Sequence, residues 1–219
     1  MNARNEVLAR IAAAHRAAPP PDLPYEEISR DYRTTSDFSA EALTELLIDR
    51  LVDYRALVRQ CSPDDLAAEI ADTLGQRSPQ TVVAPAGLDL SWTASISAQV
   101  ITDGSATDDQ LSVSELDAAD GVVTGCAVAI AETGTLILDG SAGQGRRVLT
   151  LIPDYHLCVV FPDQIVADVP QALAQLEATR PLTMISGPSA TSDIELNRVE
   201  GVHGPRTLEV IIVGETRSR

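Results

Sequence analysis

With 219 residues, the chain is long enough for one domain with a full hydrophobic core and an additional segment. Its 32 acidic and 16 basic side chains give a net charge of −16, which repels phosphate backbones and anionic membranes and argues against nucleic acid or membrane partners. All 16 basic residues are arginine, so a lysine-containing phosphate loop and Schiff-base chemistry, pyridoxal phosphate included, are excluded. No apolar run approaches the roughly 20 residues that span a bilayer, and no signal-peptide pattern opens the chain, so we expect a cytoplasmic protein.

The three cysteines, Cys61, Cys126 and Cys158, lie far apart in apolar segments. No pair has the short spacing of a zinc or iron–sulfur site, and an odd number does not favour a disulfide framework. Free cysteine is common in protein cores, so we expect three buried thiols. The sequence therefore predicts no metal centre and no cofactor of the protein's own.

The first part of the chain is predicted to be helical. Residues 2–17 form an alanine-rich helix that the following proline run ends, and residues 19–36 are Pro-rich and non-periodic, as in an irregular arm. Residues 38–54 carry apolar side chains at helical spacing, which indicates an amphipathic helix. We expect an N-terminal helix and Pro-rich arm over 1–36 and an α/β domain over 37–219.

After residue 54, short apolar strands alternate with helices. Several strands are continuous apolar runs, which is typical of a mostly parallel central sheet covered by helices on both faces, so the expected fold class is α/β. The expected strands cover residues 55–60, 81–85, 98–102, 147–152, 156–161, 182–186 and 207–213. The expected helices cover 62–74, 112–119, 169–178 and 189–199, and residues 121–140 are expected to form a strand, a short helix and a strand.

The first candidate site is the stretch Ala-Glu-Thr-Gly-Thr at 131–135. Glu132 lies between two apolar segments, where a carboxylate is costly unless it is paired or used in chemistry. Gly134 allows a sharp turn into the next strand. A structural role for Glu132, as a cap or in an ion pair with an arginine, remains an equal alternative.

The second candidate is the segment that begins with Ser-Gly-Pro-Ser at 186–189. It follows an apolar strand and precedes an expected helix, so free amides and hydroxyls would meet at the carboxyl edge of the sheet, where α/β proteins bind ligands. Plain helix capping is the alternative, but it requires only one or two of these hydroxyls. The contributing residues are Ser186, Gly187, Pro188, Ser189, Thr191, Ser192, Asp193 and Glu195.

Two further stretches are candidates. In Val-His-Gly-Pro at 202–205, His203 can act as an acid or base or hold a ligand, with Gly204 beside it, whereas His15 and His156 are interpreted as incidental. The glycine-rich stretch 140–147 ends in two arginines and could cradle an anion. Because it does not open a helix, we interpret it as a flexible connection with solvated arginines.

Three of these segments resemble one known family. AIAETGTLIL at 129–138, ISGPSATSDIE at 185–195 and GVHGP at 201–205 are similar to the lactate utilization protein C family, whose lactate-utilisation (LUD) domain was formerly a domain of uncharacterised function. The similarity spans roughly residues 40–213. It implies the NagB/RpiA/CoA-transferase-like fold, which is shared by ribose-5-phosphate isomerase, glucosamine-6-phosphate deaminase and the CoA transferases.

The resemblance also implies a role for the protein. It places the chain in a three-protein system that oxidises L-lactate to pyruvate, with iron–sulfur clusters on the two sister subunits. Glu132 corresponds in position to the nucleophilic glutamate of the CoA transferases, 186–193 to the ligand-facing helix start of the family, and His203 to its GVHGP turn. The glycine-rich CoA-binding signatures of the CoA transferases are missing, which argues against acyl transfer.

Three functions follow from the sequence. The first is a subunit without iron–sulfur clusters that binds a small carboxylate, another anion such as phosphate, or a partner; the second is an enzyme of the CoA-transferase or sugar-phosphate-isomerase type that uses Glu132. The third is a non-catalytic regulatory or assembly protein, and association of the chain with itself stays open. The candidate catalytic residues are Glu132 and His203, and the candidate ligand-binding residues are Thr133, Gly134, Ser186, Gly187, Pro188, Ser189, Thr191, Ser192, Asp193, Glu195 and Gly204.

Overall fold

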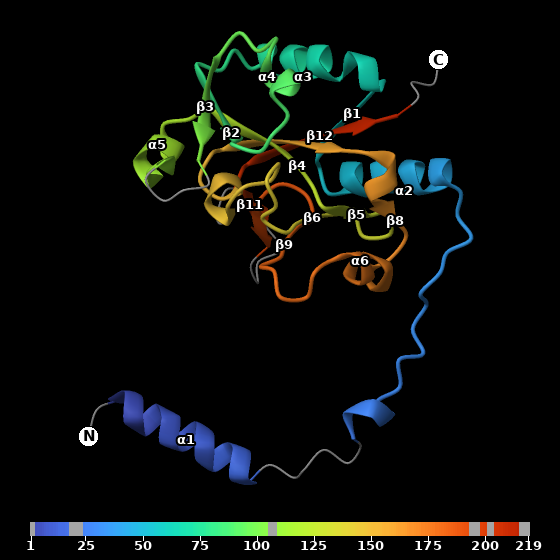
Figure 1. Ribbon diagram of the computed structural model, residues 1–219, viewed down its shortest axis with the longest axis vertical. Helices are drawn as coiled ribbons and strands as arrows, with labels where there is room; N and C mark the ends of the chain where they lie inside the picture. Colours follow the sequence, from blue (N-terminus) through green and yellow to red (C-terminus); the bar gives the residue numbers. More distant parts are fainter. Residues whose placement is uncertain (1–2, 18–23, 105–108, 193–197, 201–203, 215–219) are drawn as a thin grey trace. The chain divides into compact units, whose positions relative to one another are not determined.

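The computed structural model describes residues 3–17, 24–104, 109–192, 198–200 and 204–214 (Figure 1). The chain divides into two units, Met1–Arg33 and Thr34–Arg219. The first unit contains helix α1 (Ala3–Ala17) and the short 3-10 helix η1 (Tyr25–Glu27). Within the described ranges, no helix is long and apolar enough to cross a membrane.

A six-stranded parallel sheet forms the centre of the second unit. Its strand order is β1-β12-β7-β4-β2-β3, and every neighbouring pair is parallel. The prediction of an α/β fold with a mostly parallel central sheet is therefore confirmed. The strands are β1 (Leu57–Cys61), β2 (Thr81–Pro85), β3 (Gln99–Asp103), β4 (Gly121–Gly125), β7 (Tyr155–Val160) and β12 (Thr207–Val213).

A second, four-stranded sheet with the order β8-β5-β6-β9 packs on one face of the main sheet. Its strands are β5 (Val128–Ile130), β6 (Thr135–Leu138), β8 (Ile165–Val166) and β9 (Thr183–Ile185). The short helix expected within 121–140 is wrong, because β5 and β6 form an antiparallel hairpin there. The apolar run is too short for a stable helix, and Gly134, at φ +58°, turns the chain back at once.

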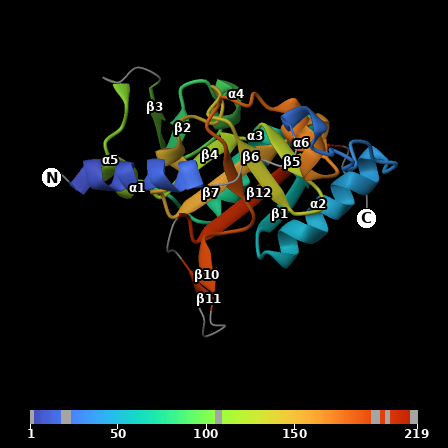
Figure 2. The same ribbon diagram turned by 90° about the horizontal axis from the view of Figure 1, so that it is seen from below.

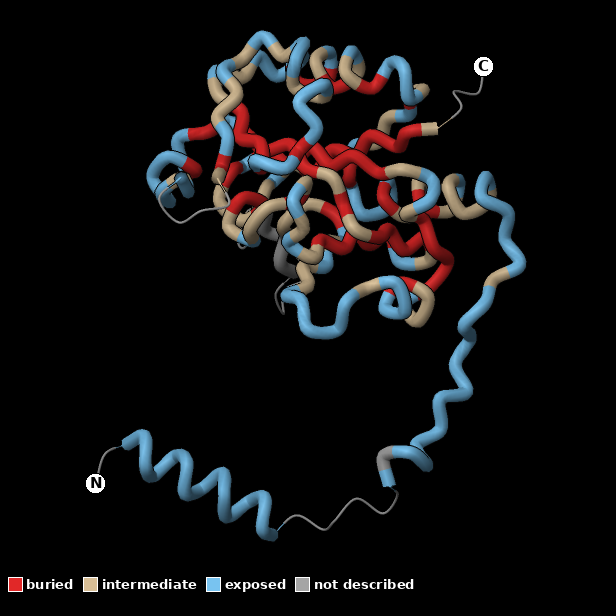
Figure 3. The backbone as a smooth tube through the Cα atoms, viewed as in Figure 1, coloured by how far each residue is buried: buried red, intermediate tan, exposed pale blue. Residues whose placement is uncertain are grey.

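Helices and sheets stack in layers around the main sheet (Figures 1 and 3). Helix α3 (Leu66–Gly75) and the short α4 (Leu90–Thr93) cover one face, with Ile70 packed against Leu157 and Ile211. Helix α2 (Ala40–Asp53) and the second sheet cover the other face, and α6 (Val169–Gln175) packs on the outer side of the second sheet. Figure 3 shows the buried residues concentrated along the strands between these layers.

Serine side chains cap the starts of three helical segments, among them Ser39 at the start of α2. Ser62 accepts a hydrogen bond from the Asp65 amide at the start of η2 (Pro63–Asp65), which leads into α3. Ser112 forms a capping box with Glu115 at the start of α5 (Val113–Asp117). Local hydrogen bonding supports the latter two starts, which agree with the helices expected over 62–74 and 112–119.

The strand expected over 147–152 is wrong. This segment is a 3-10 helix, η4 (Arg147–Thr150), in the connection from β6 to β7. Its apolar side chains serve tertiary packing, because Leu149 is buried against Val83 and Val122 of the main sheet. An apolar run of this length does not distinguish a strand from a buried turn.

The helix expected over 189–199 is also wrong. Ala190–Ser192 (β10) and Arg198–Glu200 (β11) instead pair as an antiparallel two-stranded ribbon. Figure 2 shows this ribbon extending away from the two main sheets. The β-branched residues Thr191 and Val199 favour extended backbone, and this preference prevails over the capping pattern.

One buried carboxylate joins three strands of the main sheet. Glu209 of β12 is 3% exposed and accepts hydrogen bonds from Arg59 Nε of β1 at 2.6 Å and from the Tyr155 hydroxyl of β7 at 3.0 Å. Arg77 lies 3.7 Å away on the same carboxylate. Glu209 raises the pKa of Arg59, while burial, reinforced by Glu209, raises the pKa of Tyr155. Two arginines and a hydroxyl thus compensate the buried charge.

Substitution of Glu209 tests this cluster. We expect Glu209→Ala to lower the free energy of unfolding by about 2–3 kcal/mol, because it leaves two arginines without their buried partner. Urea denaturation measures the change. Glu6→Ala, which removes the exposed ion pair with Arg10, is the control and should cause no measurable change. A loss under about 1 kcal/mol for Glu209→Ala would contradict a stabilising role.

Candidate functional site

Two glycines of the candidate motifs pack against the C-terminal end of α2. Gly134 has φ +58°, and a Cβ atom added there would lie 2.8 Å from the Cβ atom of Arg50. Gly187 has φ +81°, and its added Cβ would lie 2.7 Å from the carbonyl oxygen of Tyr54. Both positions therefore require glycine for conformation and for space, and α2 holds both turns in place.

A chain of hydroxyl groups links the first two motifs. The Oγ1 atoms of Thr133 and Thr135 lie 2.7 Å apart, and Thr135 Oγ1 lies 2.8 Å from Ser186 Oγ. The antiparallel pairing of β6 with β9 brings these residues together. Thr135 was not among the residues predicted for the site, although it ends the quoted motif and, two positions from Thr133, follows the periodicity of a strand.

Glu132 occupies the turn between β5 and β6. Its backbone amide donates to the Ala167 carbonyl oxygen at 3.0 Å, and its side chain is partly exposed. Glu132 does not line either of the two cavities described below. The turn that holds Glu132 is thus connected to the second motif by the hydroxyl of the adjacent Thr133. The carboxylate of Glu132 itself lies outside both cavities.

The second and third motifs meet directly. The Ser189 amide donates to the Pro205 carbonyl oxygen at 2.8 Å, and a Cβ atom on Gly204 would lie 3.6 Å from Ser189 Cβ. Ser189 precedes strand β10, so the expected helix-start amides are absent from this described segment, and Thr191 and Ser192 belong to that strand. The other candidates of these motifs, Asp193, Glu195 and His203, lie outside the described residues.

These segments enclose a cavity of about 220 Å³, which we call the motif cavity. Five of the candidate residues line it, together with three polar residues that were not among the predicted site residues. The five candidates are Ser186, Gly187, Pro188, Ser189 and Gly204, and the three others are Arg147, Thr150 and His156.

His156 is the first of the unexpected wall residues. It is 1% exposed, and its Nε2 atom lies 2.8 Å from Thr124 Oγ1. Its Nδ1 atom has no hydrogen-bond partner among the residues that the structure describes. An unpaired buried nitrogen is costly, so a hydrogen-bond partner for Nδ1 would be stabilising. The sequence offered no signal, since His156 sits within an apolar strand.

Arg147 is the second unexpected residue in the wall of the motif cavity. Its Nη1 atom donates to Thr150 Oγ1 at 3.2 Å, and no carboxylate of the described ranges forms an ion pair with it. Burial of part of the side chain lowers the pKa of the Arg147 guanidinium. An anion beside Arg147 would compensate this desolvation. The adjacent glycines and arginines of 140–147 were the available signal, which we interpreted as a solvated loop.

The geometry defines an α/β protein with a small polar cavity on one face of a parallel sheet. The LUD domain matches residues 56–213, and the chain belongs to the LUD domain family. A Deinococcus radiodurans protein named lactate utilization protein C is 45% identical over 216 residues, which cover 97% of this chain and 96% of that protein. A Shouchella clausii protein of the same name is 26% identical over 202 residues, with 88% of each chain covered.

A solved structure is similar as well. The crystal structure of a DUF162 family protein from Deinococcus radiodurans has a TM-score of 0.67 and 43% sequence identity. The match covers 81% of this chain and 99% of that one. The family resemblance of the three sequence motifs is thus confirmed.

Substitution of Gly187 tests the packing of the motifs on α2. We expect Gly187→Ala to lower the free energy of unfolding by about 2 kcal/mol, because a left-handed conformation costs roughly 1–2 kcal/mol for alanine and the new Cβ collides with Tyr54. Chemical denaturation checks this value. Gly75→Ala is the matched control, since a Cβ atom at Gly75 meets nothing within 4 Å, and it should leave stability unchanged or raised. Equal effects of the two substitutions would contradict the packing argument.

Proposed function

We propose that this protein takes part in L-lactate utilisation as a subunit without iron–sulfur clusters and binds a small carboxylate, such as a 2-hydroxy acid, in the motif cavity. The names of its relatives and its membership of the LUD domain family support the pathway. The observation that carries the ligand class is the wall of the cavity. It combines Arg147, which forms no ion pair with a described carboxylate, with the unpartnered Nδ1 of His156.

These groups suit the two ends of a 2-hydroxy acid. The guanidinium of Arg147 can donate to both oxygens of a carboxylate in charge-assisted hydrogen bonds. The buried, unpartnered nitrogen of His156 can pair with the 2-hydroxyl once a neighbouring side chain of the wall moves aside, and the hydroxyl of Ser186 offers a further partner. A cavity of about 220 Å³ lies below the roughly 300–1,000 Å³ of sites for drug-sized ligands, which favours a small acid.

The net charge supports a local role for Arg147. A chain with a net charge of −16 repels anions at long range, so an anionic ligand needs a cation at its site. The three cysteines are buried free thiols, which is consistent with clusters carried by partner subunits. We therefore propose that the protein acts together with iron–sulfur subunits, and because Glu132 lines neither cavity we assign no reaction to it.

Substitution of Arg147 tests the ligand. We expect the wild-type chain to bind L-lactate in isothermal titration calorimetry, and Arg147→Ala to weaken binding at least about tenfold, because a hydrogen bond to a charged group contributes roughly 1.5–3 kcal/mol. Arg206→Ala is the matched control, since Arg206 forms an exposed ion pair with Asp154 outside the motif cavity. Unchanged affinity in Arg147→Ala would overturn the proposed binding mode.

Reconstitution tests the pathway. The protein is combined with the two iron–sulfur subunits expected in its system, and lactate-dependent reduction of an artificial electron acceptor is followed. We expect the rate to depend on this protein and to fall with Arg147→Ala but not with Arg206→Ala. The same rate without the protein would contradict a role in lactate oxidation.

A further inference from the structure

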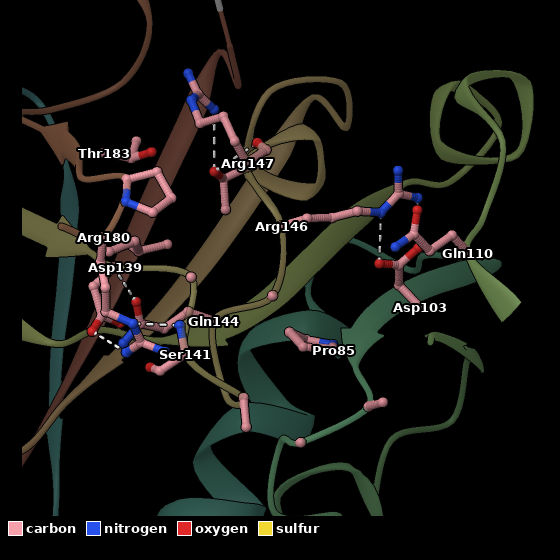
Figure 4. A pocket seen from close by; sticks show the side chains of 18 of the residues that line it. Pro85, Asp103, Gln110, Asp139, Ser141, Gln144, Arg146, Arg147, Arg180 and Thr183 are labelled. Atoms are coloured by element: carbon pink, nitrogen blue, oxygen red, sulfur yellow. Dashed lines mark hydrogen bonds and ion pairs between the residues drawn. The ribbon is translucent and has the colours of Figure 1, made fainter. Parts of the chain in front are cut away.

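A larger cavity adjoins the motif cavity on the other side of Arg147 and Thr150, which line both. It measures about 630 Å³, and we call it the loop cavity because the glycine-rich stretch 140–147 forms much of its wall (Figure 4). The ends of β2 and β3 and the segment before β9 complete the lining. Its volume lies within the range of sites for drug-sized ligands and far exceeds the space that a small acid needs.

The loop cavity lies at a reversal in the order of the parallel strands. From β2 the chain continues to β3 at one edge of the main sheet, whereas from β4 it continues to β7 on the opposite side. The carboxyl ends of β2 and β4 therefore flank a crevice of the kind in which open parallel sheets bind ligands. Pro85, the last residue of β2, lines the cavity, and the amide of Gly125, the last residue of β4, donates to the Gly143 carbonyl oxygen at 3.0 Å.

The glycine-rich wall is held in one conformation by close packing. A Cβ atom on Gly87 would lie 2.3 Å from Ala142 Cβ, and one on Gly145 would lie 2.6 Å from Leu149 Cδ1. The side chain of Gln144 is buried and accepts a hydrogen bond from the Asp139 amide at 2.6 Å. The stretch is thus closely packed around Gly145 and Gln144, while the side chain of Arg147 is exposed, as expected for a solvated arginine.

Three arginines and two aspartates line this cavity, and each aspartate forms an ion pair with one of the arginines. Arg146 binds Asp103 with two hydrogen bonds, at 2.9 and 2.7 Å, and Arg180 binds Asp139 at 2.6 Å. Figure 4 shows these pairs on opposite sides of the cavity. Despite its burial, Asp139 has a lowered pKa, because Ser141 and Arg180 donate to it. Arg147 is the remaining charge, so the described wall has a net positive charge in an acidic protein.

Part of the wall is apolar. Ala86, Leu138, Ala142 and Pro181 contribute non-polar surface between the charged pairs. An apolar surface beside guanidinium groups suits a ligand that joins an organic ring system to an anion. We propose that the loop cavity is a second ligand site, which adjoins the carboxylate site and shares Arg147 with it, and that it takes a phosphate ester of nucleotide size with its phosphate at Arg147 and Arg180.

Binding by the full-length chain tests this proposal. Isothermal titrations are run with ADP, NAD⁺, FMN, coenzyme A and inorganic phosphate as the probes. We expect at least one of the four esters to bind at one per chain and more tightly than inorganic phosphate. Binding of none of the four esters, or phosphate binding as tight as the tightest ester, would overturn the proposal.

Variants assign the site and separate it from the carboxylate site. Arg180 lines only the loop cavity, so Arg180→Ala should weaken ester binding about tenfold or more and leave L-lactate affinity unchanged. Gln110→Glu is an isosteric change on the exposed part of the wall. It should weaken ester binding, because it adds a negative charge beside the phosphate. Arg206→Ala is the control. Ester binding that Arg180→Ala and Gln110→Glu leave unchanged would contradict this site, whatever the lactate result.

Discussion

The need to cover both faces of the parallel sheet determines the arrangement of the rest of the second unit. Strands such as β7 and β12 are buried along nearly their whole length, so each face needs an apolar layer. Helix α3 supplies one layer, and α2 together with the second sheet supplies the other. The second sheet carries the candidate motifs at its turns, so covering the core also brings these motifs to the main sheet.

The motif cavity forms at the border of this second layer. The connection from β6 to β7 crosses the face of the main sheet there, anchored by Leu149, and places Arg147 and Thr150 between two cavities. Gly134 and Gly187 bring the motif turns against α2 with no space for a side chain. Backbone packing, rather than a network of charged side chains, therefore shapes the wall in which Ser186 and Ser189 lie.

Charged side chains are compensated by partners in the core but only partly compensated in the loop cavity. Glu209 is buried with two arginines and a tyrosine hydroxyl around it, which is a compensated structural cluster. In the loop cavity, Arg146 and Arg180 are each paired with an aspartate, while Arg147 keeps an uncompensated charge within the described part of the chain. Because the whole protein has a net charge of −16, the local positive charge of Arg147 is a favourable place for an anion.

The sequence by itself determined the parallel α/β sheet, the helix starts near Ser62 and Ser112 and the family, because apolar runs, helix-start patterns and contiguous motifs are properties of neighbouring residues. Only the tertiary structure decided that 147–150 is a 3-10 helix, that β10 and β11 replace a helix, and that His156 and Arg147 line a cavity. These outcomes depend on which distant segments cover the same face of the sheet. A histidine within an apolar strand stands out only when the folded chain leaves one of its nitrogens without a hydrogen-bond partner among the described residues.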